Sequence, residues 1–491
     1  MTINRWWTCA CLSTTLVLAA CGGNAPTAVT AASTASVGNL IPSLQPYATP
    51  TGTVATFSAT GSIDPSGIFF QALGTNPRSC ASCHRLSQGM SIGAAATQAL
   101  FATSGGADPL FNAVDGANCP GAAAGDAGAR SLLLNNGLIR VGREVPAAAQ
   151  FHAVASQDPY GCAESTDFAT GQPVLSVYRR PLPTAGLTFL SSVMWDARAT
   201  SQPLNQPATY GANLSADLAA QAADAVATHE QGSTALTSAQ LADLVAFERG
   251  LYSAEASDTQ AGALDAGAAG GAATLAAQAY TPGVNDPGPP GSAGAFNPVV
   301  FTLFQAWRNS ANPAQASIAR GEDIFNTAPL VITGVRGLND NPALGSPAAI
   351  PGSCSTCHDT PNVGSRSLPL TMDTGTSHVA SNETDPGVLA GLAQLTAPSL
   401  PIYQITGCAD AGGHPVTYVT TDPGQGLTTG LCADVNRVKI PGLRGLAARA
   451  PYFHNGSAAT LQAVVNFYAA RFRMRLTPQQ RQDLANFLGA L

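Results

Sequence analysis

The sequence predicts a mainly α-helical chain built from two related halves with long loops. Two observations lead to this fold class. Residues 236–251 and 476–491, LTSAQLADLVAFERGL and LTPQQRQDLANFLGAL, align without gaps and share seven of sixteen positions. Each half also carries a CxxCH motif ahead of its closing segment, at 80–84 and at 354–358. No series of alternating apolar residues in the sequence indicates a large sheet.

The closing segments carry the signals of helix beginnings. Thr237 with Gln240, and Thr477 with Gln480, have the spacing of a capping box. Pro478 suits the first helical position, and the apolar residues that follow it recur at helical spacing. Each half is therefore expected to run from its CxxCH motif through an irregular stretch to an amphipathic helix. A duplicated unit explains this repeat.

The first residues have the pattern of an export signal. Arg5 precedes an apolar run at 6–20 that is too short for a membrane span, and the run ends in the sequence LAAC at Cys21. This pattern is typical of a bacterial lipoprotein that loses residues 1–20 and carries lipid on Cys21. An ordinary secretory signal is the alternative. Gly22 and Gly23, with no aspartate after Cys21, favour a periplasmic protein anchored at the outer membrane.

Composition suggests how the rest of the chain is divided. Residues 21–60 are rich in Ala, Thr, Ser and Pro and predict a flexible tether. Residues 61–260 and 301–491 form the two predicted domains. Residues 261–300 are rich in Gly, Pro and Ala and predict a linker or insertion, whose Ala-rich first part could hold a short helix.

The charge balance limits the partners. Charged residues make up 10% of the chain, against about 25% in ordinary soluble domains. The formal net charge is −7, and no cluster of Lys and Arg occurs in the sequence. These features argue against a nucleic-acid partner.

Eight cysteines follow Cys21, and four of them belong to the CxxCH motifs. In an oxidising compartment the other four are expected to form two disulfides. Sequence alone does not fix their connectivity. Pairing neighbours keeps each bridge within its own half, which favours Cys119–Cys162 and Cys408–Cys432.

The two CxxCH motifs predict covalently bound haem. Two thiols at this spacing can form thioethers with one haem, and the adjacent histidine can then bind the iron. Zinc would need four ligands brought together from different halves, and a thioredoxin-like site would need a βαβ context. We therefore expect two c-type haems in two cytochrome c-like domains, held by Cys80, Cys83 and His84 and by Cys354, Cys357 and His358.

With these motifs the chain resembles the bacterial dihaem cytochrome c peroxidases and their relative MauG. The resemblance implies that the first haem is the peroxide site and that the second exchanges electrons. Trp195 matches the tryptophan that lies between the haems, although Ala197 replaces the glycine of that motif. The resemblance rests further on MWDARA (194–199), AFERGL (246–251), RGEDIF (320–325) and KIPGLRGLAARAPYFHNGSAATLQAVV (439–465).

The resemblance also implies a glutamine and a glutamate beside the open side of the first haem. After an insertion, the family pattern resumes at 218–231 and places Gln221 on the glutamine. The spacing to the glutamate is off by one residue, so His229 and Glu230 are both candidates for the acid/base group. Such a group moves a proton between the two oxygens of peroxide. The alternative is that His229 and Glu230 are solvated helix residues.

Tyr468 aligns with the methionine that ligates the second haem in the peroxidases, and MauG has a tyrosine there. Met474 and Met372 are rival ligands, and a buried core tyrosine is the remaining alternative. A hard tyrosine oxygen favours oxidised iron, whereas a thioether favours Fe(II). A His358/Tyr468 haem therefore implies a MauG-like cycle. In that cycle the diferric protein meets peroxide, and both haems share the oxidising equivalents in a high-valent state through Trp195.

Three minor expectations complete the site. Arg444 is expected to face a haem propionate, because arginine suits carboxylates. His454 is expected to make a structural hydrogen bond. The family often binds calcium between its domains, but no acidic loop in this sequence identifies such a site.

The favoured function is a dihaem oxidoreductase that uses hydrogen peroxide. Its further partner would be an electron donor, such as a small cytochrome or a cupredoxin, or a protein substrate. A dihaem electron carrier is the first alternative and predicts two six-coordinate irons with no distal acid/base group. A dioxygenase similar to the dihaem rubber oxygenases is the second, and it predicts a large apolar pocket over the first haem.

Overall fold

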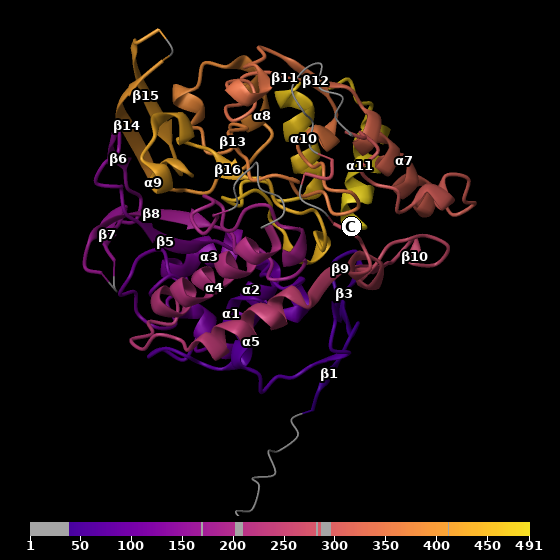
Figure 1. Cartoon of the computed structure of the whole chain (residues 1–491), viewed down its shortest axis with the longest axis horizontal. Helices are drawn as coiled ribbons and strands as arrows, with labels where there is room; N and C mark the ends of the chain where they lie inside the picture. Colours follow the sequence, from indigo (N-terminus) through magenta and orange to yellow (C-terminus); the bar gives the residue numbers. More distant parts are fainter. Residues whose placement is uncertain (1–38, 168–169, 202–209, 281–282, 286–295, 411) are drawn as a thin grey trace, which may run out of the picture. The chain divides into compact units, whose positions relative to one another are not determined.

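Short helices begin at both CxxCH motifs. Helix α1 (Cys80–Cys83) follows Ser79, the 3-10 helix η9 (Cys354–Thr356) follows Ser353, and both serines form capping boxes. The export signal 1–20 and the lipidation site Cys21 lie outside the described residues. The computed structural model describes residues 39–167, 170–201, 210–280, 283–285, 296–410 and 412–491 (Figure 1).

Two closing helices end the halves as expected from the sequence, α5 (Ser238–Arg249) and α11 (Pro478–Gly489). The Gln240 N–H donates to Thr237 Oγ1 (3.3 Å), and the Gln480 N–H donates to Thr477 Oγ1 (3.2 Å). The remaining α-helices are α2 (Ala94–Ser104), α3 (Ser131–Asn136), α4 (Tyr210–Thr228), α6 (Ala272–Ala276), α7 (Pro313–Thr327), α8 (Pro386–Leu392), α9 (Gly426–Thr429) and α10 (Leu461–Arg471).

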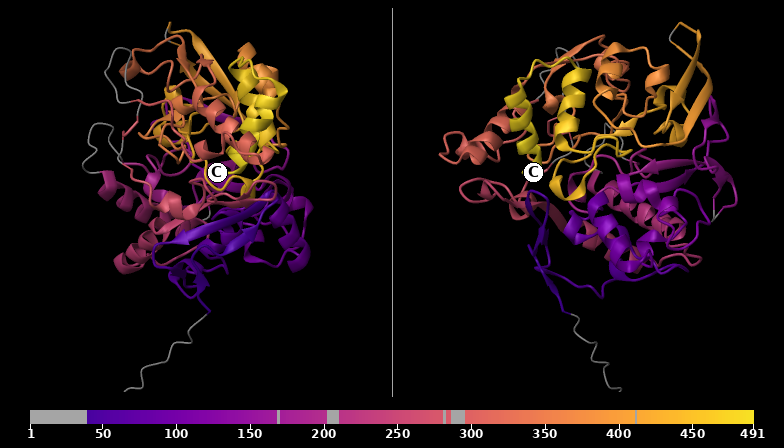
Figure 2. Two further views of the ribbon diagram at one scale, coloured as in Figure 1. Left: turned by 90° about the vertical axis from the view of Figure 1, so that its right-hand side faces the viewer. Right: turned by 180° about the vertical axis from the view of Figure 1, so that it is seen from behind.

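Helix α11 packs closely on α7, which contains the RGEDIF stretch, and it also lies beside α10 (Figure 2). The α7–α11 contact depends on Gly321, because a Cβ atom there would lie 2.0 Å from the Asp483 carbonyl oxygen. Asp483 also accepts hydrogen bonds from Ser317 (2.6 Å) and from Arg320 (2.8 Å) on α7. The glycine of RGEDIF therefore permits the helix contact, and two polar residues fix its register.

A cluster of phenylalanine rings fills the core beneath these helices. Phe301, Phe304, Phe325 and Phe487 are buried, and Phe487 meets each of the other three with ring centroids 5.2 to 6.2 Å apart. Such aromatic pairs add to the stabilisation from burial, and truncating one buried phenylalanine typically costs about 3–5 kcal/mol. This cluster holds α7 and α11 behind the second CxxCH motif, because Phe325 also lies against His358.

Glu322 on α7 is buried next to this cluster. Burial raises the pKa of its carboxyl to about 7. The Phe304 N–H donates to Oε2 (2.7 Å), and Oε1 has no hydrogen-bond partner among the described residues. The folded state thus retains a proton that the unfolded state releases between pH 4.5 and 7. The free energy of unfolding must therefore fall as pH rises through this window.

We expect Glu322→Gln to remove about 3 kcal/mol of this pH dependence between pH 4.5 and 8. The glutamine oxygen can still accept the Phe304 N–H, although the new amide nitrogen adds a constant cost at all pH values. Denaturant unfolding at several pH values measures the slope. Asp243→Asn removes an exposed carboxyl from α5 and serves as the control. An unchanged slope in Glu322→Gln would contradict the assignment.

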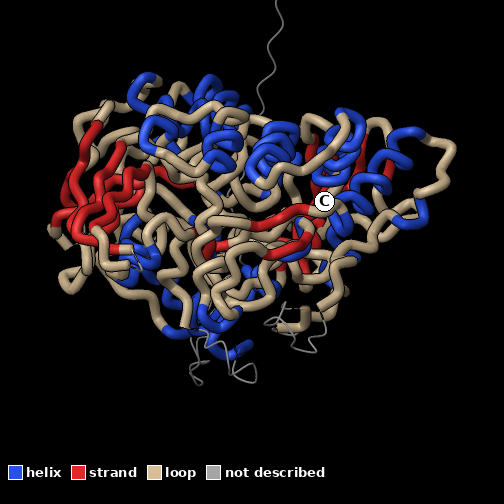
Figure 3. Tube along the Cα trace, turned by 90° about the horizontal axis from the view of Figure 1, so that it is seen from above, coloured by secondary structure: helices blue, strands red, loops and turns tan. Residues whose placement is uncertain are grey.

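Small sheets accompany the helices, and loops connect most of the elements (Figure 3). The largest sheet among the described residues has four strands in the order β10-β9-β3-β2. These strands are β2 (Pro46–Ala48), β3 (Gly52–Ser58), β9 (Leu251–Asp258) and β10 (Gly262–Ala263). The other strands are β1 (Ile41–Pro42), β4 (Ser62–Ile63), β5 (Ile139–Arg143), β6 (His152–Gln157), β7 (Glu164–Thr166), β8 (Pro173–Arg179), β11 (Leu330–Ile332), β12 (Ile350–Gly352), β13 (Thr371–Met372), β14 (Ile402–Ala409), β15 (Pro415–Thr420) and β16 (Val438–Lys439).

The strands amend two expectations. The mainly α prediction did not include them, and the predicted tether 21–60 does not extend to residue 60. Strand β3 pairs antiparallel with β9, with Ala55 opposite Ala254, so the end of the predicted tether is part of a sheet. Both alanines are buried, which explains why this stretch is held. The predicted linker 261–300 contains α6 in its Ala-rich part.

Elements from both halves pair directly, and residues 39–491 form one compact unit. Strand β6 from the first half pairs antiparallel with β14 from the second, with Ala155 opposite Tyr403 (Figure 1). Buried ions reinforce this junction, because the Arg179 guanidinium lies 2.7 Å from an Asp422 oxygen and 2.7 Å from an Asp196 oxygen. The Asp of the WDAR stretch thus belongs to a network that joins the halves.

The structure contains two disulfides, Cys119–Cys162 and Cys408–Cys432. These are the pairs expected from the sequence. The first links the stretch before α3 to the segment between β6 and β7, and the second links β14 to the segment after α9. Among the described residues no helix is long and apolar enough to cross a membrane.

Candidate dihaem site

His84 stands at the C-terminal end of α1 and lines a first cavity, which has about 1700 Å³ of empty space including its mouth. Its Nδ1 lies 3.1 Å from the Met90 carbonyl oxygen. A carbonyl only accepts, so Nδ1 carries the proton and Nε2 keeps its lone pair. Burial lowers the pKa of this imidazole to about 4, which keeps it neutral. The histidine is thus prepared to bind a metal through Nε2.

His358 repeats this arrangement in a second cavity, which has about 1530 Å³ of empty space including its mouth. Its Nδ1 lies 2.5 Å from the Gly364 carbonyl oxygen, six residues further along the chain, as Met90 is from His84. Burial likewise lowers its pKa to about 4. Both CxxCH histidines therefore have the same tautomer, fixed by the same local contact, which is how ligating histidines are oriented in metal sites.

The motif cysteines lie beside these histidines and take part in no disulfide. Burial raises the pKa of Cys354 to about 12 and that of Cys357 to about 11, and it also raises the pKa values of Cys80 and Cys83. Such thiols are poor nucleophiles in the free protein. Among the described residues no group of three or more His, Cys, Asp or Glu is placed to hold a metal ion.

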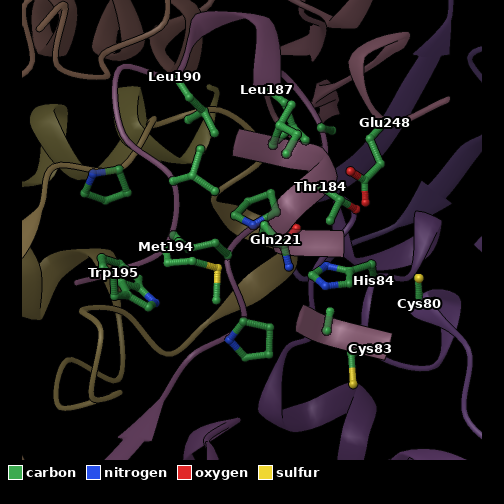
Figure 4. A pocket seen from close by; sticks show the side chains of 18 of the residues that line it. Cys80, Cys83, His84, Thr184, Leu187, Leu190, Met194, Trp195, Gln221 and Glu248 are labelled. Carbon is green, nitrogen blue, oxygen red and sulfur yellow. The ribbon is translucent and has the colours of Figure 1, made fainter. Parts of the chain in front are cut away.

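The two cavities share a wall. Trp195, Arg180 and Lys439 line both of them, together with Pro181, Pro441 and Gly442. The Trp195 indole N–H donates to the Arg180 carbonyl oxygen (2.7 Å), and its ring centroid lies 6.0 Å from that of His454. In the view of Figure 4, His84 and Trp195 lie toward opposite ends of the first cavity. The tryptophan selected from the sequence is thus the aromatic residue between the cavities.

The structure brings all three distal candidates, Gln221, His229 and Glu230, to the first cavity. Gln221 lies on α4, and Figure 4 shows it near His84. His229 and Glu230 follow the end of α4, so they are not the solvated helix residues of the alternative interpretation. Their surroundings differ, because the His229 Nδ1 contacts the Asp115 carboxylate while Glu230 accepts the Leu73 N–H (2.7 Å).

All three ligand candidates for the second haem line the second cavity: Tyr468, Met474 and Met372. Tyr468 lies on α10, and its ring stacks on Phe472 with an interplanar angle of 12°. Burial raises the pKa of its hydroxyl, and Cys357 and Cys354 add to this rise. Both methionines are buried in the same apolar cluster. The structure therefore places the rivals together and keeps Tyr468 as a candidate.

Buried cations surround the two cavities, and the sequence analysis identified only Arg444 among them. Lys439 and Arg180 are 2% and 5% exposed, and both lack a carboxylate partner among the described ion pairs. Burial lowers the pKa of Lys439 to about 7 and that of Arg180 to about 9. Among the residues that the structure describes, the Lys439 Nζ donates only to the Ser192 carbonyl oxygen (2.6 Å), and the Nε of Arg444 has no hydrogen-bond partner.

Buried cations without anions are costly unless a ligand supplies the negative charge. A haem carries two propionates, and Arg444 lines the first cavity, Arg449 the second, and Lys439 and Arg180 both. The residues present therefore fit two haems: cysteines for the thioethers, histidines with free Nε2 atoms, and cations for the propionates. No signal in the sequence singled out Lys439 or Arg180, because their isolation from carboxylates depends on the fold.

Glu248, from the AFERGL stretch, was also missed. Its carboxyl is buried and lines the first cavity, and Thr184 lies beside it (Figure 4). Within the described part of the chain, one oxygen of Glu248 and the hydroxyl of Thr184 have no hydrogen-bond partner. Burial raises the pKa of Glu248 to about 8, so it is protonated at neutral pH. His454, by contrast, has the structural role expected, since its Nε2 lies 3.1 Å from the Ser377 hydroxyl.

No protein-family model matches this chain, and no curated protein does. Among solved structures, the crystal structure of a MauG-like protein associated with microbial copper homeostasis matches with 16% sequence identity and a TM-score of 0.27. The match covers 67% of this chain and 79% of that one. A likeness this distant does not define the fold or the function, so the residues of the chain itself carry the functional argument.

Proposed function

We propose that this chain is a dihaem c-type oxidoreductase that uses hydrogen peroxide. One observation supports this more than any other. Two cavities, each with a CxxCH histidine whose Nδ1 contacts a backbone carbonyl, share Trp195 as a wall, and they differ in the residues that line them. The first has the acid/base candidates Gln221, His229 and Glu230. The second has the ligand candidates Tyr468, Met474 and Met372. An electron carrier would not need this asymmetry.

When bound, the two haems would supply the redox chemistry: one iron to activate peroxide and both to provide electrons. His84 and His358 would hold the irons, and Lys439, Arg180, Arg444 and Arg449 would hold the propionates. The chain's task at the first cavity is to move a proton between the peroxide oxygens, and His229 and Glu230 are the candidates for it. Trp195 would connect the cavities.

The two-part arrangement also supports an internal duplication of cytochrome c-like domains, 61–260 and 301–491. The parallels are the serine caps before each CxxCH motif, the carbonyl contact six residues after each histidine, and the capping boxes of α5 and α11. The proposal further includes a periplasmic location and a lipid anchor on Cys21 at the outer membrane. The proposal also includes a partner, which is either an electron donor or a protein substrate. These parts rest on the sequence pattern.

One observation favours a second candidate function, a dioxygenase acting on an apolar substrate. Leu187, Leu190, Val193, Met194 and Leu218 line the first cavity. Such a lining would suit an apolar substrate, and it would equally suit the faces of a haem. Oxygen uptake without peroxide would favour this candidate.

The peroxide function is tested by adding one equivalent of hydrogen peroxide to the purified diferric protein. We expect a rapid, lasting change in the Soret and near-infrared absorption without prior reduction. Reaction only after a one-electron reduction would indicate a conventional peroxidase whose second haem stores an electron. No reaction in either state would leave the dihaem electron carrier as the better function.

A further inference from the structure

A buried carboxylate contacts the Nδ1 atom of the His229 imidazole. Asp115 is 4% exposed, and its Oδ2 contacts the His229 Nδ1. The other carboxylate oxygen pairs with the guanidinium of Arg78, which is 2% exposed. Arg78 is itself fixed by the carbonyl oxygens of Pro109 (2.9 Å) and Leu110 (2.9 Å). Arg78, Asp115 and His229 therefore form a chain of contacts, and all three residues line the first cavity.

This contact determines which nitrogen of His229 carries the proton. An ionised carboxylate can only accept hydrogen bonds, so Nδ1 must donate and Nε2 keeps its lone pair. The Nε2 atom has no hydrogen-bond partner among the described residues. The backbone of His229 is held as well, because its carbonyl oxygen accepts from the Asn76 amide (3.0 Å). His229 is thus a fixed base with its acceptor atom available at the first cavity.

The charges around His229 keep the base neutral. Burial, reinforced by the charges of Arg78 and Arg198, lowers the pKa of its imidazole to about 4, although Asp224 and Glu230 act in the opposite direction. His84, which lines the same cavity, is also neutral. At neutral pH His229 is therefore mostly the neutral imidazole, with its single proton on Nδ1.

Glu230, the rival residue, is engaged elsewhere. Its Oε2 accepts the Leu73 N–H (2.7 Å), and its Oε1 lies 3.7 Å from the Cys80 sulfur. A Cβ atom at Gly74 would lie 1.8 Å from the Glu230 carbonyl oxygen, so the backbone is packed tightly here too. Glu230 thus ties the loop before the first CxxCH motif to the end of α4, and its carboxylate is not free to turn into the cavity.

We propose that His229 is the proton-transferring group of the first cavity and that Asp115 is its positioning residue. This inference rests on the proposed function and deepens it. The Nε2 of His229 accepts the proton from one oxygen of hydrogen peroxide and returns it to the other. The O–O bond then breaks and the protonated oxygen leaves as water. The bound haems would supply the two electrons that reduce the other oxygen, which leaves as a second water after taking up two protons.

The test measures how fast cyanide associates with the diferric protein, by stopped-flow absorption across pH. Hydrogen cyanide must lose its proton to bind iron as the anion, so a base in the cavity accelerates the reaction. We expect His229→Gln to slow association about 100-fold, the lower end of the range for general-base removal. The variant rate should then follow only the ionisation of hydrogen cyanide itself.

Asp115→Asn tests the positioning role. An amide can donate to Nδ1 and so permits the wrong tautomer, which leads us to expect association about tenfold slower with His229 still present. His414→Gln is the matched control, because His414 pairs with Asp410 at an exposed position. Its association rate should match the wild-type rate. His229→Gln keeps the Arg78–Asp115 ion pair, so it remains informative if Asp115→Asn does not fold.

Two results would overturn the inference. One is wild-type cyanide association in His229→Gln; the other is a larger loss in Glu230→Gln than in His229→Gln. Either would leave the proposed function standing, provided that the wild-type protein binds cyanide and reacts with peroxide. A wild-type protein that binds no cyanide at all would instead defeat the proposed function, because neither iron would then be open.

Discussion

Replacing Trp195 with phenylalanine is expected to uncouple the two haems. Trp195 lines both cavities, so in the proposed dihaem protein an electron that moves between the haems would have this indole in its path. Phenylalanine keeps a ring at this position but has no indole N–H and is harder to oxidise. We expect peroxide to react with the first haem as before. The spectral change at the second haem should become at least about tenfold slower, a rise of about 1.4 kcal/mol in its barrier.

Trp307→Phe is the matched control for this substitution. The Trp307 indole also donates to a backbone carbonyl, that of Ala266 (3.1 Å), but it lies in the phenylalanine cluster and lines neither cavity. Both variants should lose about 1 kcal/mol of stability with the hydrogen bond. Stopped-flow spectra that separate the two haems give the answer. Equal exchange rates in Trp195→Phe and the wild-type protein would remove Trp195 from the electron path.

Tyr468→Met is expected to raise the reduction potential of the second haem. A tyrosine oxygen favours oxidised iron, and a thioether favours the reduced form. Axial ligands change haem potentials over about 0.8 V, and we expect this exchange to account for an increase on the order of 0.2 V. The variant should then need one electron before it reacts with peroxide. Spectroelectrochemical titration of both haems measures the change.

Two conservative variants test the rival ligands. Met474→Leu and Met372→Leu nearly preserve volume in the apolar cluster and should each cost less than about 1.5 kcal/mol. If Tyr468 is the ligand, neither variant shifts the potential of the second haem. A shift in Met474→Leu, together with an unchanged potential in Tyr468→Met, would assign the methionine instead.

Local signals in the sequence predict the features that depend on contacts within a few residues. These features are the capping boxes of α5 and α11 and the short helix in the Ala-rich first part of residues 261–300. Gln221, His229 and Glu230 were found because a resemblance selected their stretch. Sequence could not choose between the last two, because the choice depends on Asp115, which lies 114 residues from His229.

The features that sequence did not predict all involve distant parts of the chain. The composition of residues 21–60 predicts a tether and gives no sign of β3, because its partner strand β9 lies about 200 residues further on. The sequence does not identify Lys439 or Arg180 as residues of the site. A buried cation points to an anionic ligand only when the fold leaves it without a carboxylate partner. The same holds for the orphan oxygen of Glu248, which follows a phenylalanine in an otherwise ordinary amphipathic helix.

The pairing of β6 with β14 has a consequence for how the chain is made. Ser156 on β6 bonds to Ile402 on β14, 246 residues further along. At a synthesis rate of about 5–20 residues per second, the β6 edge waits roughly 10 to 50 s for its partner. An open strand edge of this kind can pair with other chains. The edge of β6 that β14 covers in the folded chain is therefore open to pairing with other chains until β14 has been made.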